Sequence, residues 1–122
     1  MLNDNFDKEE LLIRAVYPKD VLPSLWKEDG SLSSAAFKDK NGLSVSRTGG
    51  RSLEEALIAT RKRLSGVMVT VTVQNCLDLK LLLRYLPTDE DEYHSEIHRD
   101  EKKAGLTSGQ AKQLASCAKL HN

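Results

Sequence analysis

The sequence predicts a small α+β domain in which a mixed or antiparallel sheet of three to four strands carries two to three packed helices. A chain of 122 residues with 39% hydrophobic and 30% charged residues has the size and composition of one globular domain. Residues 67–73 are typical of a strand, and residues 53–64 have the periodicity of a helix. Strands and helices do not alternate regularly, which disfavours a parallel β-α-β architecture.

The first third of this single domain, residues 1–122, holds one ambiguous run and several turns. Residues 1–7 are expected to be a frayed end. Residues 8–16 are largely apolar but too few for periodicity to distinguish a helix from a strand, and Pro18 ends the run. Asp29-Gly30 predicts a turn, and residues 43–46 alternate apolar and polar as in a strand.

The clearest element is a helix beginning after Ser52. Ser52 is a good N-cap, and Glu55 three residues later completes a capping-box pattern. Gly66 is expected to end the helix. The apolar positions recur at helical spacing and define one buried face: Leu53, Ala56, Leu57, Thr60 and Leu64.

The second half of the chain predicts three strands and a final helix. Residues 67–73, 81–86 and 93–98 are the strands, with a short turn or helical segment at residues 75–79 and an acidic loop at residues 89–92. Thr107 or Ser108 is expected to cap the C-terminal helix. Its apolar stripe is Ala111, Leu114, Ala115 and Ala118.

The charges balance but are segregated along the chain. There are 18 basic and 18 acidic side chains, so the whole surface does not favour nucleic acid or an anionic membrane. Residues 38–63 nevertheless carry a net charge of +4 and residues 89–101 a net charge of −6. Blocks of opposite sign can pair with each other or with a partner.

Cysteine usage and hydropathy predict a cytoplasmic protein. Cys76 and Cys117 lie far apart, which favours two free thiols in a reducing compartment over a single disulfide. The sequence has neither a signal-peptide pattern nor an apolar run near the ~20 residues of a membrane span. We expect no membrane contact and no cofactor.

The sharpest local motif is His94-Ser95-Glu96-Ile97-His98. In a strand, His94, Glu96 and His98 project from the same face. Two imidazoles and a carboxylate are reasonable first ligands for zinc or iron. The alternative interpretation is a solvated polar strand face beside an acidic loop.

A second candidate site is basic. Arginine side chains bind phosphate through paired N–H groups, and neighbouring serines and Gly49-Gly50 could add donors. Without aromatic residues among these cations, nucleic-acid binding is possible but not favoured. The alternative is a helix with a solvated basic end. The cluster consists of Arg47, Arg51, Arg61, Lys62 and Arg63.

Several short motifs resemble a family of small uncharacterised bacterial proteins. They are Ile13-Arg14, Ser-Ser-Ala-Ala-Phe at residues 33–37, Leu-Ser-Val at residues 43–45, Leu86-Pro87 and the His-containing segment at residues 93–97. The resemblance covers most of residues 11–98 and implies no activity. It directs attention to Arg14, Ser33, Ser34, Ser44 and His94.

Arg14 and Glu96 also faintly resemble the early Arg and late Glu that ADP-ribosyltransferase-like proteins place around a nicotinamide dinucleotide. The chain is short for that fold, and Glu96 lacks the surrounding motif.

Two classes of function follow. The first is a non-catalytic binding or accessory module that uses its charged segments to contact a protein partner. The alternative is a small enzyme that binds a nucleotide or phosphate in one cavity, with His94 as acid or base. The expected lining of that cavity is Arg14, Ser33, Ser34, Arg47 and His94. Because the sequence contains no complete catalytic constellation, the first class is favoured.

Overall fold

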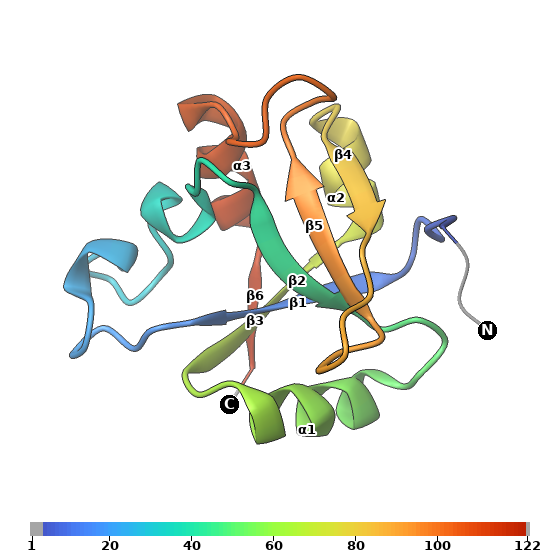
Figure 1. Ribbon diagram of the computed structural model, residues 1–122. Helices are drawn as coiled ribbons and strands as arrows, with labels where there is room; N and C mark the ends of the chain where they lie inside the picture. Colours follow the sequence, from blue (N-terminus) through green and yellow to red (C-terminus); the bar gives the residue numbers. More distant parts are fainter. Residues whose placement is uncertain (1–3, 122) are drawn as a thin grey trace.

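Six strands form one antiparallel sheet in the described part of the chain, residues 4–121 of a computed structural model (Figure 1). The strand order across the sheet is β4-β5-β2-β1-β3-β6. The α+β class and antiparallel pairing are confirmed, whereas the expected number of three to four strands is wrong. The strands are β1 (Leu11–Val16), β2 (Leu43–Arg47), β3 (Val67–Thr72), β4 (Leu82–Tyr85), β5 (His94–His98) and β6 (Lys119–His121).

The two additional strands are β1 and β6. The ambiguous run at residues 8–16 becomes β1, which pairs with both β2 and β3 at the centre of the sheet. The predicted C-terminal helix included Ala118, but helix α3 (Ser108–Cys117) ends at Cys117 and Ala118 is extended. Residues Lys119–His121 then pair with the outer edge of β3, whose backbone N–H and C=O groups would otherwise lack partners.

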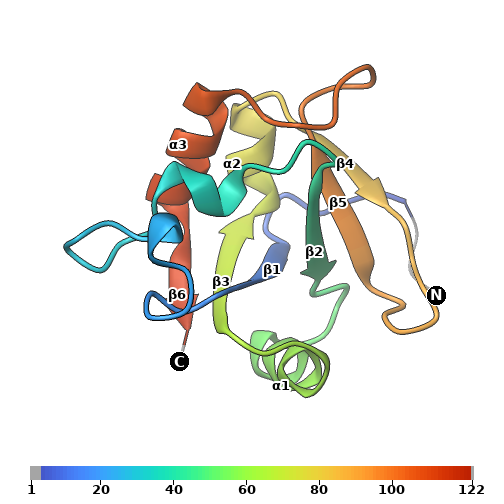
Figure 2. The ribbon, with the colours of Figure 1, turned by 60° about the vertical axis from the view of Figure 1, so that its left-hand side comes forward.

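Helices cover both faces of the sheet, with α1 at one end of the molecule and α2 and α3 at the other (Figures 1 and 2). Helix α1 (Leu53–Arg63) places Ala56 and Leu57 on Ile13 and Met68. The opposite face carries the larger core beneath α2 (Val73–Asp78), α3 and the 3-10 helix η2 (Ser34–Phe37), while a second 3-10 helix, η1 (Pro23–Leu25), lies in the preceding loop. The sheet residues of that core are Leu12, Val16, Leu43, Val45, Val69, Val71 and Ile97.

The helix starts follow the predicted capping chemistry. The Ser52 side chain accepts a hydrogen bond from the N–H of Glu55, which confirms the predicted N-cap. The Glu55 carboxylate accepts from the Ser52 hydroxyl and not from its backbone N–H, so the predicted capping box is incomplete. Of the two predicted caps of α3, Thr107 is the one used. Thr72 and Asn75 form a complete capping box, so α2 begins at Val73 and β3 ends one residue earlier than predicted.

The face that carries α1 is only half covered. Strand β2 pairs with β5 so that Ser44 lies opposite Glu96 and Ser46 opposite His94. Directly paired residues of an antiparallel sheet project from the same face. Ser46 also pairs with Ile13, which lies under α1, so these side chains share the α1 face.

No helix of residues 4–121 is long and apolar enough to cross a membrane.

Candidate functional site

A polar strip occupies the open half of the α1 face, formed by His94, Glu96 and His98 of β5 with Ser44 of β2. The prediction that the three β5 side chains share a face is confirmed. Nε2 of His98 lies 2.8 Å from Oε1 of Glu96, and Nε2 of His94 lies 3.5 Å from Oε2. One carboxylate therefore bridges two imidazoles on a partly exposed surface.

The Glu96 carboxylate is held in its charged form. The hydrogen bond from His98 lowers the pKa of Glu96 most strongly, burial raises it, and the contact with His94 lowers it further, so the net shift is downward. The His98 ring lies against Gly42, where a Cβ atom would be 2.7 Å from the ring. Gly42 thus makes room for His98 at the end of the strip.

The prediction of a metal site at the polar strip gains no support from the geometry. Within residues 4–121 there is no group of three or more His, Cys, Asp and Glu side chains that could hold a metal ion. The Glu96 carboxylate contacts Nε2 of both imidazoles, so the three side chains interact with one another.

The cavity expected from Arg14 and His94 is not present. Arg14 follows Ile13 along β1 and so projects from the opposite face of the sheet to His94. Its Nε donates to the carbonyl of Ala36 and its Nη1 to the carbonyl of Ser44, both at 3.0 Å. The expectation that these two residues line one cavity is therefore wrong, and Arg14 and Glu96 are likewise separated by the sheet.

The predicted serines have local structural positions. Ser33 is the N-cap of η2: its side chain accepts from the N–H of Ala35 and donates to the carbonyl of Ser24 at 2.7 Å. Ser34 lies in the first turn of η2. Neither side chain is near the polar strip, because η2 covers the other face of the sheet. Ser44 and His94 are the two residues of the resemblance that share a face.

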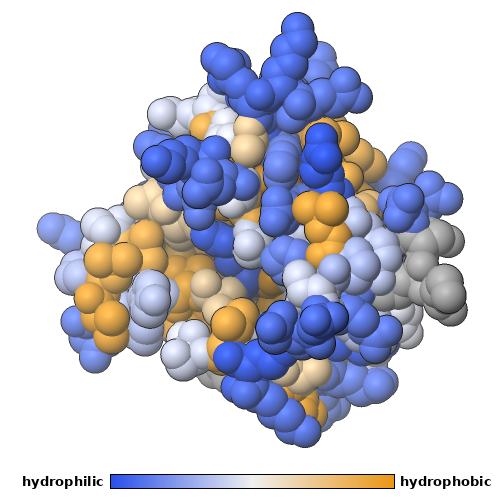
Figure 3. Space-filling model, viewed as in Figure 1, coloured by the Kyte–Doolittle hydropathy of each residue, from blue (hydrophilic) through white to orange (hydrophobic). Residues whose placement is uncertain are grey.

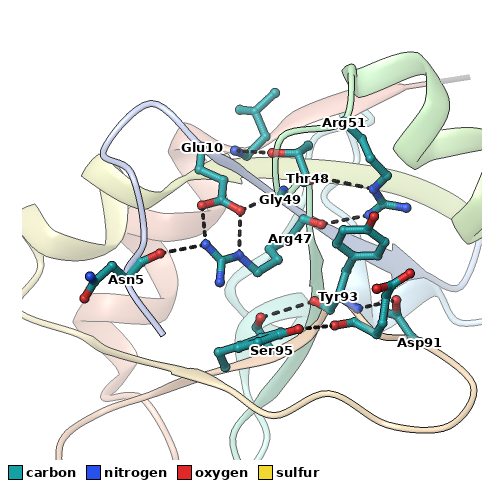
Figure 4. Close-up of polar contacts among 12 residues, drawn as sticks. Asn5, Glu10, Arg47, Thr48, Gly49, Arg51, Asp91, Tyr93 and Ser95 are labelled. Atoms are coloured by element: carbon teal, nitrogen blue, oxygen red, sulfur yellow. Dashed lines mark hydrogen bonds and ion pairs between the residues drawn. The ribbon is translucent and has the colours of Figure 1, made fainter. Parts of the chain in front are cut away.

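The basic cluster is divided among separate contacts. Arg47 is buried and forms a bidentate ion pair with Glu10 (Figure 4). Its Nε donates to Oε2 of Glu10 at 2.6 Å and its Nη2 to Oε1 at 2.8 Å. Arg51 lies over the ring of Tyr93, 3.5 Å from its centroid, and donates to the carbonyls of Thr48 and Arg47.

The three cations at the end of α1 also differ in their surroundings. Arg63 pairs with Asp91 at 3.1 Å. Lys62 lines an open groove that Arg61 does not reach. Arg51, Lys62 and Arg63 thus line the same groove, whereas Arg47 and Arg61 lie outside it.

The chain matches no family model, no curated protein and no solved structure. The bacterial resemblance thus stays a prediction.

An outer groove of about 500 Å³ lies between α1 and the loop joining β4 to β5. Its apolar lining comes from Ile58, of which 48% is exposed, from Ala59 and from Tyr93. The remaining residues are charged, from both the helix and the loop: Arg51, Glu55, Lys62, Arg63, Glu90, Asp91 and Glu92. The basic and acidic segments of the sequence thus face each other across this groove.

An inner cavity of about 40 Å³ lies beneath the end of α1, against the sheet. Ser46 lines it, and its buried Oγ makes no hydrogen bond to any described residue. A buried hydroxyl without a partner costs about 1–3 kcal/mol. The full lining is Ile13, Ala15, Ser44, Val45, Ser46, Thr60, Arg63, Leu64, Asp91 and His94.

The sequence identified His94 and Arg63 of this region, counted Ser46 among the serines near the basic cluster and Asp91 in the acidic loop, but missed Ile58. The alternating pattern of residues 43–46 places Ser44 and Ser46 on one face. Which other strand faces them depends on pairing with β5, about fifty residues away along the chain. Ile58 is an apolar residue on the otherwise polar side of α1, and such an exposed apolar side chain can indicate a contact surface.

Proposed function

We propose that this protein is a non-catalytic binding module that engages a protein partner in the outer groove. The observation that carries the proposal is the meeting of the basic and acidic segments across a groove with an apolar lining. A volume of about 500 Å³ is within the usual range of ligand sites. The dispersal of the expected Arg, Ser and His residues disfavours the alternative of an enzyme.

The charges of the groove define the partner's chemistry. Lys62 on the helix side and Glu90 and Glu92 on the loop side make no ion pair with a described residue. Ile58 offers an exposed apolar contact between them. A complementary segment carries an apolar side chain between an acidic residue, which meets Lys62, and a basic residue, which meets the loop. Hydrophobic residues on the face shown in Figure 3 lie in separate small areas among hydrophilic ones, which suits recognition by mixed contacts.

The test is selection of peptides from a random display library on the immobilised full chain. We expect enrichment of peptides with the charged–apolar–charged pattern. Ile58→Asp should weaken their binding by about tenfold or more, because it removes the central apolar contact. Lys62→Glu should weaken binding by at least about twofold and lower the salt sensitivity of the remaining interaction, because an attractive charge pair that salt would screen is lost.

Arg61→Glu is the matched control, since it makes the same charge change one residue away but outside the groove. A peptide with its acidic residue changed to lysine should bind the Lys62→Glu variant more tightly than the original peptide does. The same change in the peptide should not improve its binding to the Arg61→Glu variant. If the selected peptides bind the Ile58→Asp variant as tightly as the unaltered protein, or if no sequence is enriched, the proposal is wrong.

A further inference from the structure

The inner cavity has the properties of a subsite for a small polar group. It lies between the sheet and the end of α1 and has room for about three water-sized atoms. Ser46 is 3% exposed and holds the single buried side-chain nitrogen or oxygen atom of the described residues that lacks a hydrogen-bond partner. This hydroxyl is therefore available to a water molecule or to a polar group of a ligand that enters the cavity.

The cavity and the outer groove meet at one ion pair. Arg63 and Asp91 line both hollows, and their side chains lie 3.1 Å apart. The Arg63 side chain is 29% exposed, whereas that of Asp91 is 8% exposed and also accepts a hydrogen bond from the N–H of Tyr93. Asp91 is thus the more firmly held residue of the ion pair. Movement of the more exposed Arg63 side chain would connect the groove to the cavity.

The groups around the cavity favour a ligand that both donates and accepts hydrogen bonds. Ser46 and the remaining N–H groups of Arg63 supply donors. Asp91 supplies an acceptor, and Thr60, whose hydroxyl donates to the carbonyl of Ala56, keeps its lone pairs available. Arg63 and Asp91 together carry no net charge, so a charged group in the cavity would meet one like and one opposite charge and would lose its hydration without a net partner, which favours a neutral group.

We propose that the inner cavity binds a carboxamide, carried by an Asn or Gln side chain of the segment that occupies the outer groove. A carboxamide has three heavy atoms in one plane, with an acceptor beside a donor. Its oxygen accepts from Ser46 and Arg63, and its NH₂ group donates to Asp91. This inference rests on the proposed function for the source of the group, but the chemistry of the cavity is tested separately.

The experiment is an NMR titration of the ¹⁵N-labelled full chain with propionamide, propionate and propionamidinium. These probes have similar size and differ in their donors and acceptors. We expect saturable shifts with propionamide at the amides of residues 44–46, 60–64 and 91–94, and affinities at least about fivefold weaker for the two charged probes. Ser46→Ala should lower the propionamide affinity by a similar factor. It removes a hydroxyl that has no partner in the chain, so it leaves the fold intact.

Two control variants separate the cavity from its surroundings. Ser65→Ala removes an exposed hydroxyl outside the cavity and should leave the titration unchanged. Ile58→Asp, which abolishes the proposed groove contact, should also leave it unchanged. Tighter binding of propionate, equal binding by the Ser46→Ala variant, or no saturable shift with propionamide would each overturn the carboxamide assignment. Any of these results can occur while selected peptides still bind the groove, so the two proposals fail independently.

Discussion

Glu10 and Arg47 form a buried ion pair that fastens the segment before β1 to the end of β2 (Figure 4). Their side chains are 6% and 4% exposed, and the N–H of Gly49 donates a further hydrogen bond to Glu10. Arg47 also donates to the carbonyl of Asn5 and lies under the ring of Phe6. Of the end expected to fray, residues 1–3 lie outside the described part, whereas Asn5 and Phe6 are held against Arg47.

Removing one member of this pair should strongly destabilise the protein. Glu10→Ala leaves a buried guanidinium without its carboxylate, which costs about 3–5 kcal/mol. The measurement is urea unfolding of the variant, with Glu9→Ala as the control because Glu9 is exposed. Combining Glu10→Leu with Arg47→Met should recover most of the loss, because it removes both buried charges. A loss below about 1 kcal/mol for Glu10→Ala, the scale of an exposed pair, would contradict the burial of this contact.

Gly42→Ala should displace His98 from the polar strip. Gly42 has φ +94°, where a side chain is unfavourable by about 1–2 kcal/mol, and its new Cβ would also meet the His98 ring. Gly30→Ala is the matched control, since Gly30 has φ +89° but no atom within 4 Å of the added Cβ. Urea unfolding should show a larger loss for Gly42→Ala, and only this variant should shift the imidazole NMR signals of His98. Equal effects of the two substitutions would argue against the Gly42–His98 contact.

Acidification should weaken the attachment of β6. Burial lowers the pKa of His121 most, and the charges of Lys119 and Arg61 lower it further, so the folded protein favours a neutral imidazole. Its ring contacts Oγ1 of Thr70 at 2.9 Å. Because the folded-state pKa is depressed, this contribution to stability is complete above the ordinary value of 6.5 and decreases as the pH falls through the folded-state pKa.

The measurement is unfolding free energy from about pH 8 to about pH 5 for the unaltered chain and for His121→Gln. The glutamine keeps a polar side chain that does not titrate. The unaltered chain should lose more stability than the variant across this range. Parallel pH profiles would show that His121 does not contribute.

The two cysteines should differ sharply in reactivity. Burial raises the pKa of the Cys76 thiol to about 12, with a smaller contribution from Cys117, so Cys76 has very little thiolate at neutral pH. Cys117 is exposed, and neither thiol is in a disulfide. Iodoacetamide should modify Cys117 in the native protein and Cys76 only after unfolding. The labelled positions are identified by mass spectrometry of protein digests. Rapid labelling of Cys76 in the native protein would contradict its burial.

The local elements of this fold were largely predictable because short-range interactions specify them. Ser52 with Glu55 sets the start of α1, and the β-branched run at residues 67–73 forms β3. The failures are at positions where a distant partner decides the outcome. Lys119–His121 has weak local preferences and becomes a strand because the edge of β3 is available.

The sequence by itself determined the α+β class, the helix caps and the face on which His94, Glu96 and His98 project, because these depend on neighbours within a few residues. Only the tertiary structure decided that Ser46 faces His94 and that Arg63 meets Asp91 between the groove and the cavity. These relationships arise from the strand order, which joins residues far apart in the chain. Ile13 shares a face with Ser46 and His94, and side chains alternate between the two faces along a strand. Arg14, the next residue, therefore lies on the face opposite to His94.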